Sequence, residues 1–131
     1  MKLSLTSIQC NLHWENRKAN LDMFEAKISN IEETDMIVLP EMFSTGFTMK
    51  PELHFDTMEG ETIAWMKALS IKKNAAICGS IIIKNEVGQF VNRFLFVSLD
   101  EIQYYDKAHL FRMGEENQHY VKGESQKVIQ Y

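Results

Sequence analysis

The segment NRKANLDMFEAKISNIEETDMIVLP, residues 16–40, carries the pattern that decides the fold of this chain. Apolar residues in its first part recur at steps of three and four: Leu21, Phe24, Ile28 and Ile31. This spacing predicts an amphipathic helix over residues 16–31. The apolar run at 35–39 predicts a short buried strand closed by Pro40, and the alternating residues 3–9 predict another strand before the helix. Such a β-α-β unit predicts parallel strands and a right-handed crossover.

Downstream of this unit, the pattern predicts a second helix, a hairpin and further short strands. The expected segments are a loop over 45–57, a helix over 59–73, strands over 75–83, 90–99 and 102–106, a long loop over 108–123 that could include a helical turn, and a strand over 127–131. Up to residue 106 the resulting order is β-α-β-α-β-β-β, which belongs to the α/β class. A sheet of this class normally continues through a helix on its second face, so we expect the chain to be part of a larger domain.

Composition excludes several classes of function. The 131 residues suit one domain, and the net charge of −4 gives no reason to expect nucleic acid or an anionic membrane as a partner. No apolar run approaches the ~18 residues of a membrane span, so we interpret the protein as cytoplasmic. Cys10 and Cys78 lack zinc spacing, the histidines lack metal spacing, and no glycine-rich phosphate loop is present. We therefore predict no metal and no organic cofactor.

Two ionisable residues fall at the carboxyl ends of predicted strands, where ligands bind in open α/β sheets. Glu41 follows the strand at 35–39 after Pro40, and Lys107 follows the strand at 102–106 directly. If these strands are neighbours in a parallel or mixed sheet, the two side chains share one pocket. A carboxylate can take a proton from a nucleophile, and an ammonium can stabilise an oxyanion. The alternative is a partly buried ion pair without a catalytic task.

Two motifs resemble those of the nitrilase (carbon–nitrogen hydrolase) superfamily. LPEMFSTGF, residues 39–47, is similar to its glutamate motif, and YDKAHLF, residues 105–111, is similar to its lysine motif. Between them, CGSI at 78–81 and Asn92-Arg93 resemble the central hairpin of the family. The resemblance covers essentially the whole chain and implies a four-layer αββα sandwich. Residues 1–131 would be the N-terminal half of one such domain.

The resemblance also implies catalytic roles. Glu41 would be the general base, Lys107 the oxyanion stabiliser, and a second glutamate would orient the set. Glu116 matches that second glutamate best, with Glu115 as the rival. The nucleophilic cysteine of the family lies on a strand-to-helix elbow beyond the strand expected at 127–131, and the sequence ends before it. We therefore expect these residues alone to be inactive as an enzyme.

A narrower resemblance points to a substrate. MFSTGF at 42–47 and LFRMG at 110–114 resemble the omega-amidase branch, which hydrolyses the terminal amide of short α-keto acid amides such as 2-oxoglutaramate to the acid and ammonia. The candidates for substrate contact are Phe43, Phe47, Arg112 and Met113. Arg112 could hold a substrate carboxylate through its planar fork. The alternative is that the three apolar residues are packing residues and that Arg112 lies on the surface.

The implied partners are a small-molecule amide and either a second copy of the chain or the C-terminal half of the domain. A function of a different class stays open. The chain could serve as a non-catalytic binding or assembly module that keeps the nitrilase scaffold. The residue at the elbow beyond Tyr131 discriminates the two, because a cysteine there favours the enzyme.

Overall fold

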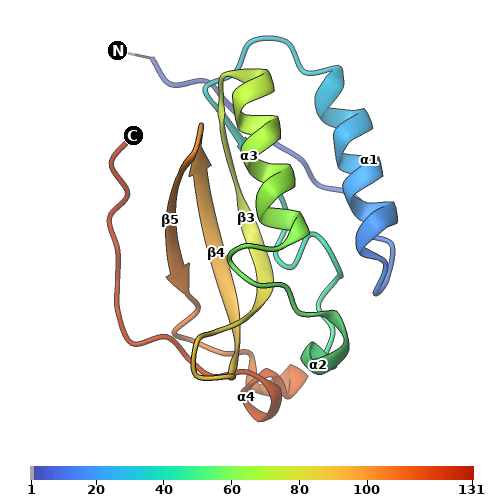
Figure 1. The fold of residues 1–131 in the computed structure, drawn as a ribbon, viewed down its shortest axis with the longest axis vertical. Coiled ribbons are helices and arrows are strands. Elements are labelled where there is room, and N and C mark those ends of the chain that lie inside the picture. The colour runs from blue at the N-terminus through green and yellow to red at the C-terminus, as the bar shows by residue number, and fades with distance from the viewer. Residues whose placement is uncertain (1) are drawn as a thin grey trace.

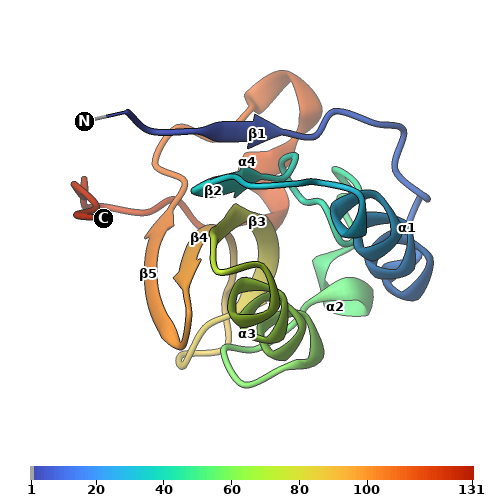
Figure 2. The same cartoon turned by 90° about the horizontal axis from the view of Figure 1, so that it is seen from above.

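The computed structural model describes residues 2–131 and shows a five-stranded sheet with two long helices on one face (Figures 1 and 2). The elements in chain order are β1 (Leu5–Ser7), α1 (Arg17–Ser29), β2 (Met36–Val38), α2 (Pro51–His54), α3 (Glu61–Lys73), β3 (Ala76–Lys84), β4 (Phe90–Ser98), β5 (Glu101–Asp106), the 3-10 turn η1 (Arg112–Gly114) and α4 (Glu116–His119). The predicted α/β class is confirmed.

The strands lie side by side in the order of the sequence, β1-β2-β3-β4-β5. The first three are parallel, whereas β3, β4 and β5 are joined antiparallel. The predicted β-α-β unit and the predicted hairpin are therefore both present. Since β5 is antiparallel to β4, and β4 to β3, strands β2 and β5 run in the same direction and end at the same edge of the sheet.

The two long helices begin where side chains satisfy their free N–H groups. Asn16 precedes α1 and its side-chain oxygen accepts a hydrogen bond from the N–H of Ala19 at 3.1 Å. α3 begins at Glu61, two residues later than predicted, and the Asp56 carboxylate accepts from the N–H of Thr62 at 3.0 Å. The capping carboxylate thus comes from a residue outside the helix that periodicity alone does not reveal.

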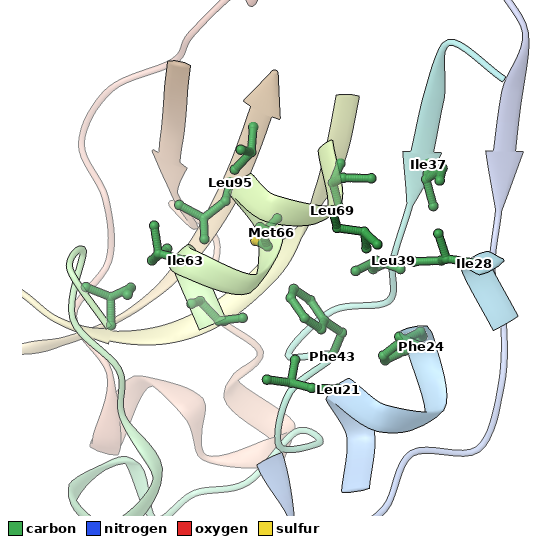
Figure 3. Packing of buried hydrophobic residues seen from close by; sticks show 14 of the residues in the cluster. Leu21, Phe24, Ile28, Ile37, Leu39, Phe43, Ile63, Met66, Leu69 and Leu95 are labelled. Atoms are coloured by element: carbon green, nitrogen blue, oxygen red, sulfur yellow. The ribbon is translucent and has the colours of Figure 1, made fainter. Parts of the chain in front are cut away.

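The main core lies between the helices and the sheet (Figure 3). Its fully buried members include Phe24 and Ile28 from α1, Met66 from α3 and Ile77 from β3. Phe43, from the segment after β2, packs edge-to-face on Phe24 with ring centroids 5.7 Å apart. This burial fixes both long helices on one face of the sheet, and neither of them covers the opposite face.

The opposite face of the sheet is apolar and only partly covered. A small cluster, Ala76, Cys78 and Phe96, is buried there, with Ile129 against it. Leu3 and Leu5 are 58% and 55% exposed. We call this side of the sheet the open face.

The prediction of a strand at 127–131 is wrong. These residues form no strand, and Ile129 and Tyr131 pack against the open face. The Tyr131 ring packs on Phe96 with centroids 5.3 Å apart, and the Tyr131 hydroxyl donates to the carbonyl of Asp35 at 2.7 Å. A segment that lies over a sheet face meets side chains, so it has no row of backbone groups with which to form a ladder.

Of the short helices, α2 was not predicted, whereas the helical turn that the sequence allowed for within residues 108–123 is present as η1 and α4. α2 lies inside the loop expected at 45–57 and has Pro51 in its first turn, where proline is tolerated. α4 and η1 lie inside the loop expected at 108–123. Elements of three or four residues are too short to show a period. Within residues 2–131, no helix combines the length and apolar character needed to cross a membrane.

Asn20 joins α1 to two loops and provides a test of this fold. It is fully buried and exchanges two hydrogen bonds with the backbone of His13, and it donates a third to the carbonyl of Ser44 at 3.0 Å. Asn20→Ala leaves these buried groups unpaired, so we expect the free energy of unfolding to fall by about 2–3 kcal/mol in chemical denaturation. Lys18→Ala, on the exposed face of α1, should change it by less than about 0.5 kcal/mol. Equal effects of the two substitutions would contradict this account of Asn20.

Candidate active site

The segment that carries Glu41 is bound to β3 along its length. The N–H of Leu39 donates to the carbonyl of Cys78 at 2.7 Å, and the N–H of Phe43 donates to the carbonyl of Ser80 at 3.1 Å. The Ser80 hydroxyl accepts from the N–H of Met42 at 2.9 Å. Glu41 is therefore held by backbone hydrogen bonds on both sides, beyond the end of β2.

Lys107 follows β5 and is fixed by its own backbone. Its N–H donates to the carbonyl of Asn92 in β4, and its carbonyl accepts from the N–H of Gly123, both at 2.9 Å. A Cβ atom at Gly123 would lie 2.1 Å from the carbonyl oxygen of Asp106, so only glycine allows the chain to return here. The loop over 108–123 thus begins and ends beside Lys107.

Glu116 lies inside that loop, in the first turn of α4, and its side chain is 0% exposed. One carboxylate oxygen, Oε2, accepts from the N–H of Phe111 at 2.6 Å, and the other, Oε1, accepts from the Asn92 amide at 3.1 Å. Glu115 is exposed and adopts a left-handed backbone conformation with φ of 60°. Glu116, and not Glu115, therefore points into the site.

The three predicted residues meet at the Lys107 ammonium. Its Nζ lies 2.8 Å from Glu41 Oε1 and 2.9 Å from Glu116 Oε2. Burial lowers the pKa of Lys107, but the hydrogen bonds and negative charges of Glu41 and Glu116 outweigh burial and raise this pKa above its ordinary value. The group is therefore an ammonium at neutral pH, and one of its three N–H groups remains for another acceptor.

Two cavities meet at Glu41 and Lys107, which line both. One, of about 310 Å³, lies over the open face and is also lined by Leu39, Gly79, Ser80, Asn92, Phe94 and Tyr105. The other, of about 450 Å³, is also lined by Phe47, His109, Leu110 and Phe111. Both volumes fall within the range of small-molecule sites. A larger hollow, of about 820 Å³, lies at the β3-β4 hairpin but contains none of the three charged residues, so we place the candidate site at the first two.

The structure brings Glu41, Lys107 and Glu116 together, although the condition stated for their meeting, that the two strands be neighbours, is not met by β2 and β5. Strands β3 and β4 lie between them. The side chains still meet because β2 and β5 end at the same edge, and because the residues after β2 continue along β3, where Glu41 reaches Asn92 of β4. The lysine and both glutamates thus approach from three separate segments.

The four residues predicted to contact substrate lie in different environments. Phe47 lines the second cavity, and Lys107 Nζ lies 5.3 Å from the centre of its ring. Phe43 is 0% exposed and belongs to the core on the helix side, which agrees with the alternative that it is a packing residue. Arg112 and Met113 are exposed in η1 and line neither cavity, with Met113 89% exposed. Their contact with a substrate stays a prediction.

Sequence reasoning did not single out Asn92 as a site residue. It lies in β4, and its Nδ2 donates to Glu41 Oε1 at 2.7 Å as well as to Glu116. The available signal was the polar pair Asn92-Arg93 within the mostly apolar strand at 90–99. Phe111 was also missed, and its N–H is the backbone donor to Glu116.

Neither cysteine lies in the site. Cys78 is buried beneath the open face, its Sγ donates to the carbonyl of Ile37 at 3.5 Å, and burial raises the pKa of its thiol to about 11. Cys10 packs at the margin of the core on the helix side. Among residues 2–131, no three His, Cys, Asp or Glu side chains gather in a way that could hold a metal ion.

Comparison with known proteins agrees with this geometry. The carbon-nitrogen hydrolase family matches residues 4–130. Two proteins named omega-amidase YafV are similar to this chain, with 42% identity for the one from Yersinia enterocolitica and 38% for the one from Escherichia coli K12. Each match extends over 130 residues, which are 98% of this chain and 50% of the relative. The chain thus spans about half the length of the curated relatives it matches.

Solved structures show the same fold. XC1258 from Xanthomonas campestris, described as a CN-hydrolase superfamily protein, superposes with a TM-score of 0.93 and 31% identity over 98% of this chain and 49% of its own. Nit3 from Saccharomyces cerevisiae, a member of the nitrilase superfamily, superposes with a TM-score of 0.80 over 95% of this chain and 50% of its own. At 19% identity, the second match supports the fold alone. The chain therefore belongs to the carbon–nitrogen hydrolase family, within the nitrilase superfamily.

Proposed function

We propose that the protein containing this chain is an amidase that converts the terminal carboxamide of a short α-keto acid amide, similar to 2-oxoglutaramate, to the acid and ammonia. The observation that carries the proposal is the Lys107 ammonium between Glu41 and Glu116, at the meeting point of two small cavities. The names of the two relatives, both omega-amidases, support an amide as the substrate.

Glu41 would act as the general base. Its Oε1 accepts hydrogen bonds from Lys107 and Asn92, whereas its Oε2 has no hydrogen-bond partner among residues 2–131. This leaves one oxygen to take the proton of a cysteine thiol while the sulfur attacks the amide carbon. The same proton then passes to the leaving nitrogen as the C–N bond breaks, which releases ammonia and leaves a thioester. Water deprotonated by Glu41 would hydrolyse the thioester to the acid and regenerate the thiol.

Lys107 would stabilise the negative oxygen of the tetrahedral intermediates. A fixed positive charge in a partly dry site acts strongly on charge that develops during the reaction. Glu116 would orient the ammonium, because it is fully buried and anchored by the N–H of Phe111. Two of the ammonium's N–H groups are thereby assigned to carboxylates, and the third would donate to the substrate oxygen.

We propose that the nucleophile is a cysteine outside this chain. The burial of Cys78 and the position of Cys10 at the helix-side core support this, as does the length of the relatives, about twice that of the chain. The segment with that cysteine would approach from the open face, where the first cavity lies. On this proposal, residues 1–131 form the N-terminal half of one catalytic domain and are inactive alone.

The cavities support a small substrate. Phe47 lies against the Lys107 ammonium and would form one wall of the binding site. Phe43 is not included in the proposed substrate site because it is a core residue. Recognition of a substrate carboxylate by Arg112, a cytoplasmic location and homo-oligomeric assembly stay predictions.

Substitutions in the site test the proposal through ammonia release from 2-oxoglutaramate by the full-length protein. Glu41→Gln removes the base and should lower kcat/KM by roughly 10²–10⁴-fold. Lys107→Met removes the oxyanion stabiliser and should lower it by about 10²–10³-fold. Glu116→Gln should also lower activity, while Glu115→Gln, which changes an exposed carboxylate, should have little effect. A folded wild-type protein that releases no ammonia from short amides would contradict the proposal and favour the non-catalytic module.

Alkylation tests the assignment of the cysteines. With its pKa near 11, Cys78 holds little thiolate at pH 8, and its burial excludes the reagent. We expect iodoacetamide at pH 8 to leave Cys78 unmodified in the native protein, as measured by peptide mass spectrometry, and to modify it in urea. Cys10, which is partly exposed, is an internal reference and should react faster. Rapid native labelling of Cys78 would reopen it as a nucleophile.

A further inference from the structure

Asn92 binds both carboxylates of the candidate site at once. It lies in β4 opposite Ile82, is 2% exposed, and donates from Nδ2 to Glu41 Oε1 at 2.7 Å and to Glu116 Oε1 at 3.1 Å. An amide nitrogen has two hydrogens, one for each acceptor. Because both neighbours are carboxylates, the nitrogen and not the amide oxygen must face them.

The four side chains form a closed ring of hydrogen bonds. Lys107 joins Glu41 to Glu116 on one side, and Asn92 joins the same two carboxylates on the other. Two carboxylates that face one ammonium leave one negative charge in excess, and their mutual repulsion would drive them apart. A neutral group with two donors holds them together without adding charge.

Asn92 also positions Lys107 through the main chain. Its carbonyl accepts from the N–H of Lys107 at 2.9 Å, directly after β5 ends. β4 is paired on both edges, with β3 and with β5, so it is a rigid base for such a residue. Asn92 therefore fixes the backbone of Lys107 and the side chain of Glu41.

We propose that Asn92 is a positioning residue for the amidase reaction, which keeps Glu41 Oε1 bound so that Oε2 faces the nucleophile. This inference rests on the proposed amidase function. Asn92 acts through Glu41 and Lys107 and forms no bond with the substrate carbon. If Asn92 were only a structural residue, its loss would reduce stability but would leave turnover by the folded protein unchanged.

Kinetics of the full-length protein separate these roles. Asn92→Leu, of similar size but without donors, should lower kcat on the order of 10–100-fold, since misplaced groups cost about that much, with little change in KM. Asn92→Asp has the same shape but adds a third carboxylate, and should lose at least as much. Asn92→Gln keeps the amide on a longer stem and should recover part of the loss. Val91→Ala, a core change at the neighbouring position, is the matched control and should lower stability but leave kcat unchanged.

A kcat of Asn92→Leu within about twofold of the wild-type value, or the same loss of kcat in Val91→Ala, would overturn the positioning role.

NMR of the Asn92 side-chain amide gives a readout that is independent of activity. Glu41→Gln and Glu116→Gln should each shift the resonance of one of its two protons, because each removes a charged acceptor. If neither resonance moves, the inference fails even when the enzyme is active. If both resonances move but the wild-type full-length protein releases no ammonia, the amidase proposal fails but the bridge between the carboxylates stands.

Discussion

The buried carboxylate of Glu116 sets the constraint that the rest of the site satisfies. Withdrawing a carboxylate from water costs several kcal/mol of free energy unless positive charge and hydrogen bonds from the protein replace the lost water. Here the Lys107 ammonium, the Asn92 amide and the N–H of Phe111 supply that replacement. These donors come from the end of β5, from β4 and from the loop over 108–123. Loss of any one would leave charge uncompensated in a closed space, so the three segments keep a fixed arrangement.

The loop over 108–123 depends on this constraint and supports it in return. Tyr120, near its end, is buried against Met42 and Ile82, and its hydroxyl donates to the carbonyl of Thr48 at 2.6 Å. Burial raises the pKa of Tyr120, so the hydroxyl keeps its proton and remains a donor. Apolar packing thus holds one end of the loop while the charged cluster holds the other. The second cavity lies beside this loop, with Phe111 and Leu110 in its wall.

Much of the fold followed from periodicity in the sequence. α1 and α3 show the helical period, and β3 and β4 are long enough to be recognised as apolar strands. Glu41 and Lys107 were found because each follows a strand and because their motifs resemble those of a known family. Phe43 was a pocket candidate through that resemblance alone, with packing as the alternative. Met42 has a φ of +46°, so the chain turns directly after Glu41, and Phe43 lies in the core on the helix side.

Other features depend on contacts that a local pattern does not contain. The expected strand at 127–131 has suitable residues, but its conformation depends on whether an edge of a sheet lies within reach. Asn92 occupies a strand position like any other, and only the folded sheet shows that it faces two glutamates. Glu116 could be preferred over Glu115 by resemblance alone, whereas the structure shows its burial and its partners.

The protonation state of Lys107 supports the proposed division of labour between lysine and glutamate. A lysine can serve as a base near neutral pH only if its pKa falls, as burial without partners would cause. Here two carboxylates outweigh burial and raise the pKa of Lys107. The ammonium and its ion pairs therefore persist through neutral pH, and their contribution to stability is lost only as pH rises through this raised pKa. Proton transfer would then fall to Glu41, whose second oxygen has no partner among the described residues, while Lys107 supplies a permanent positive charge.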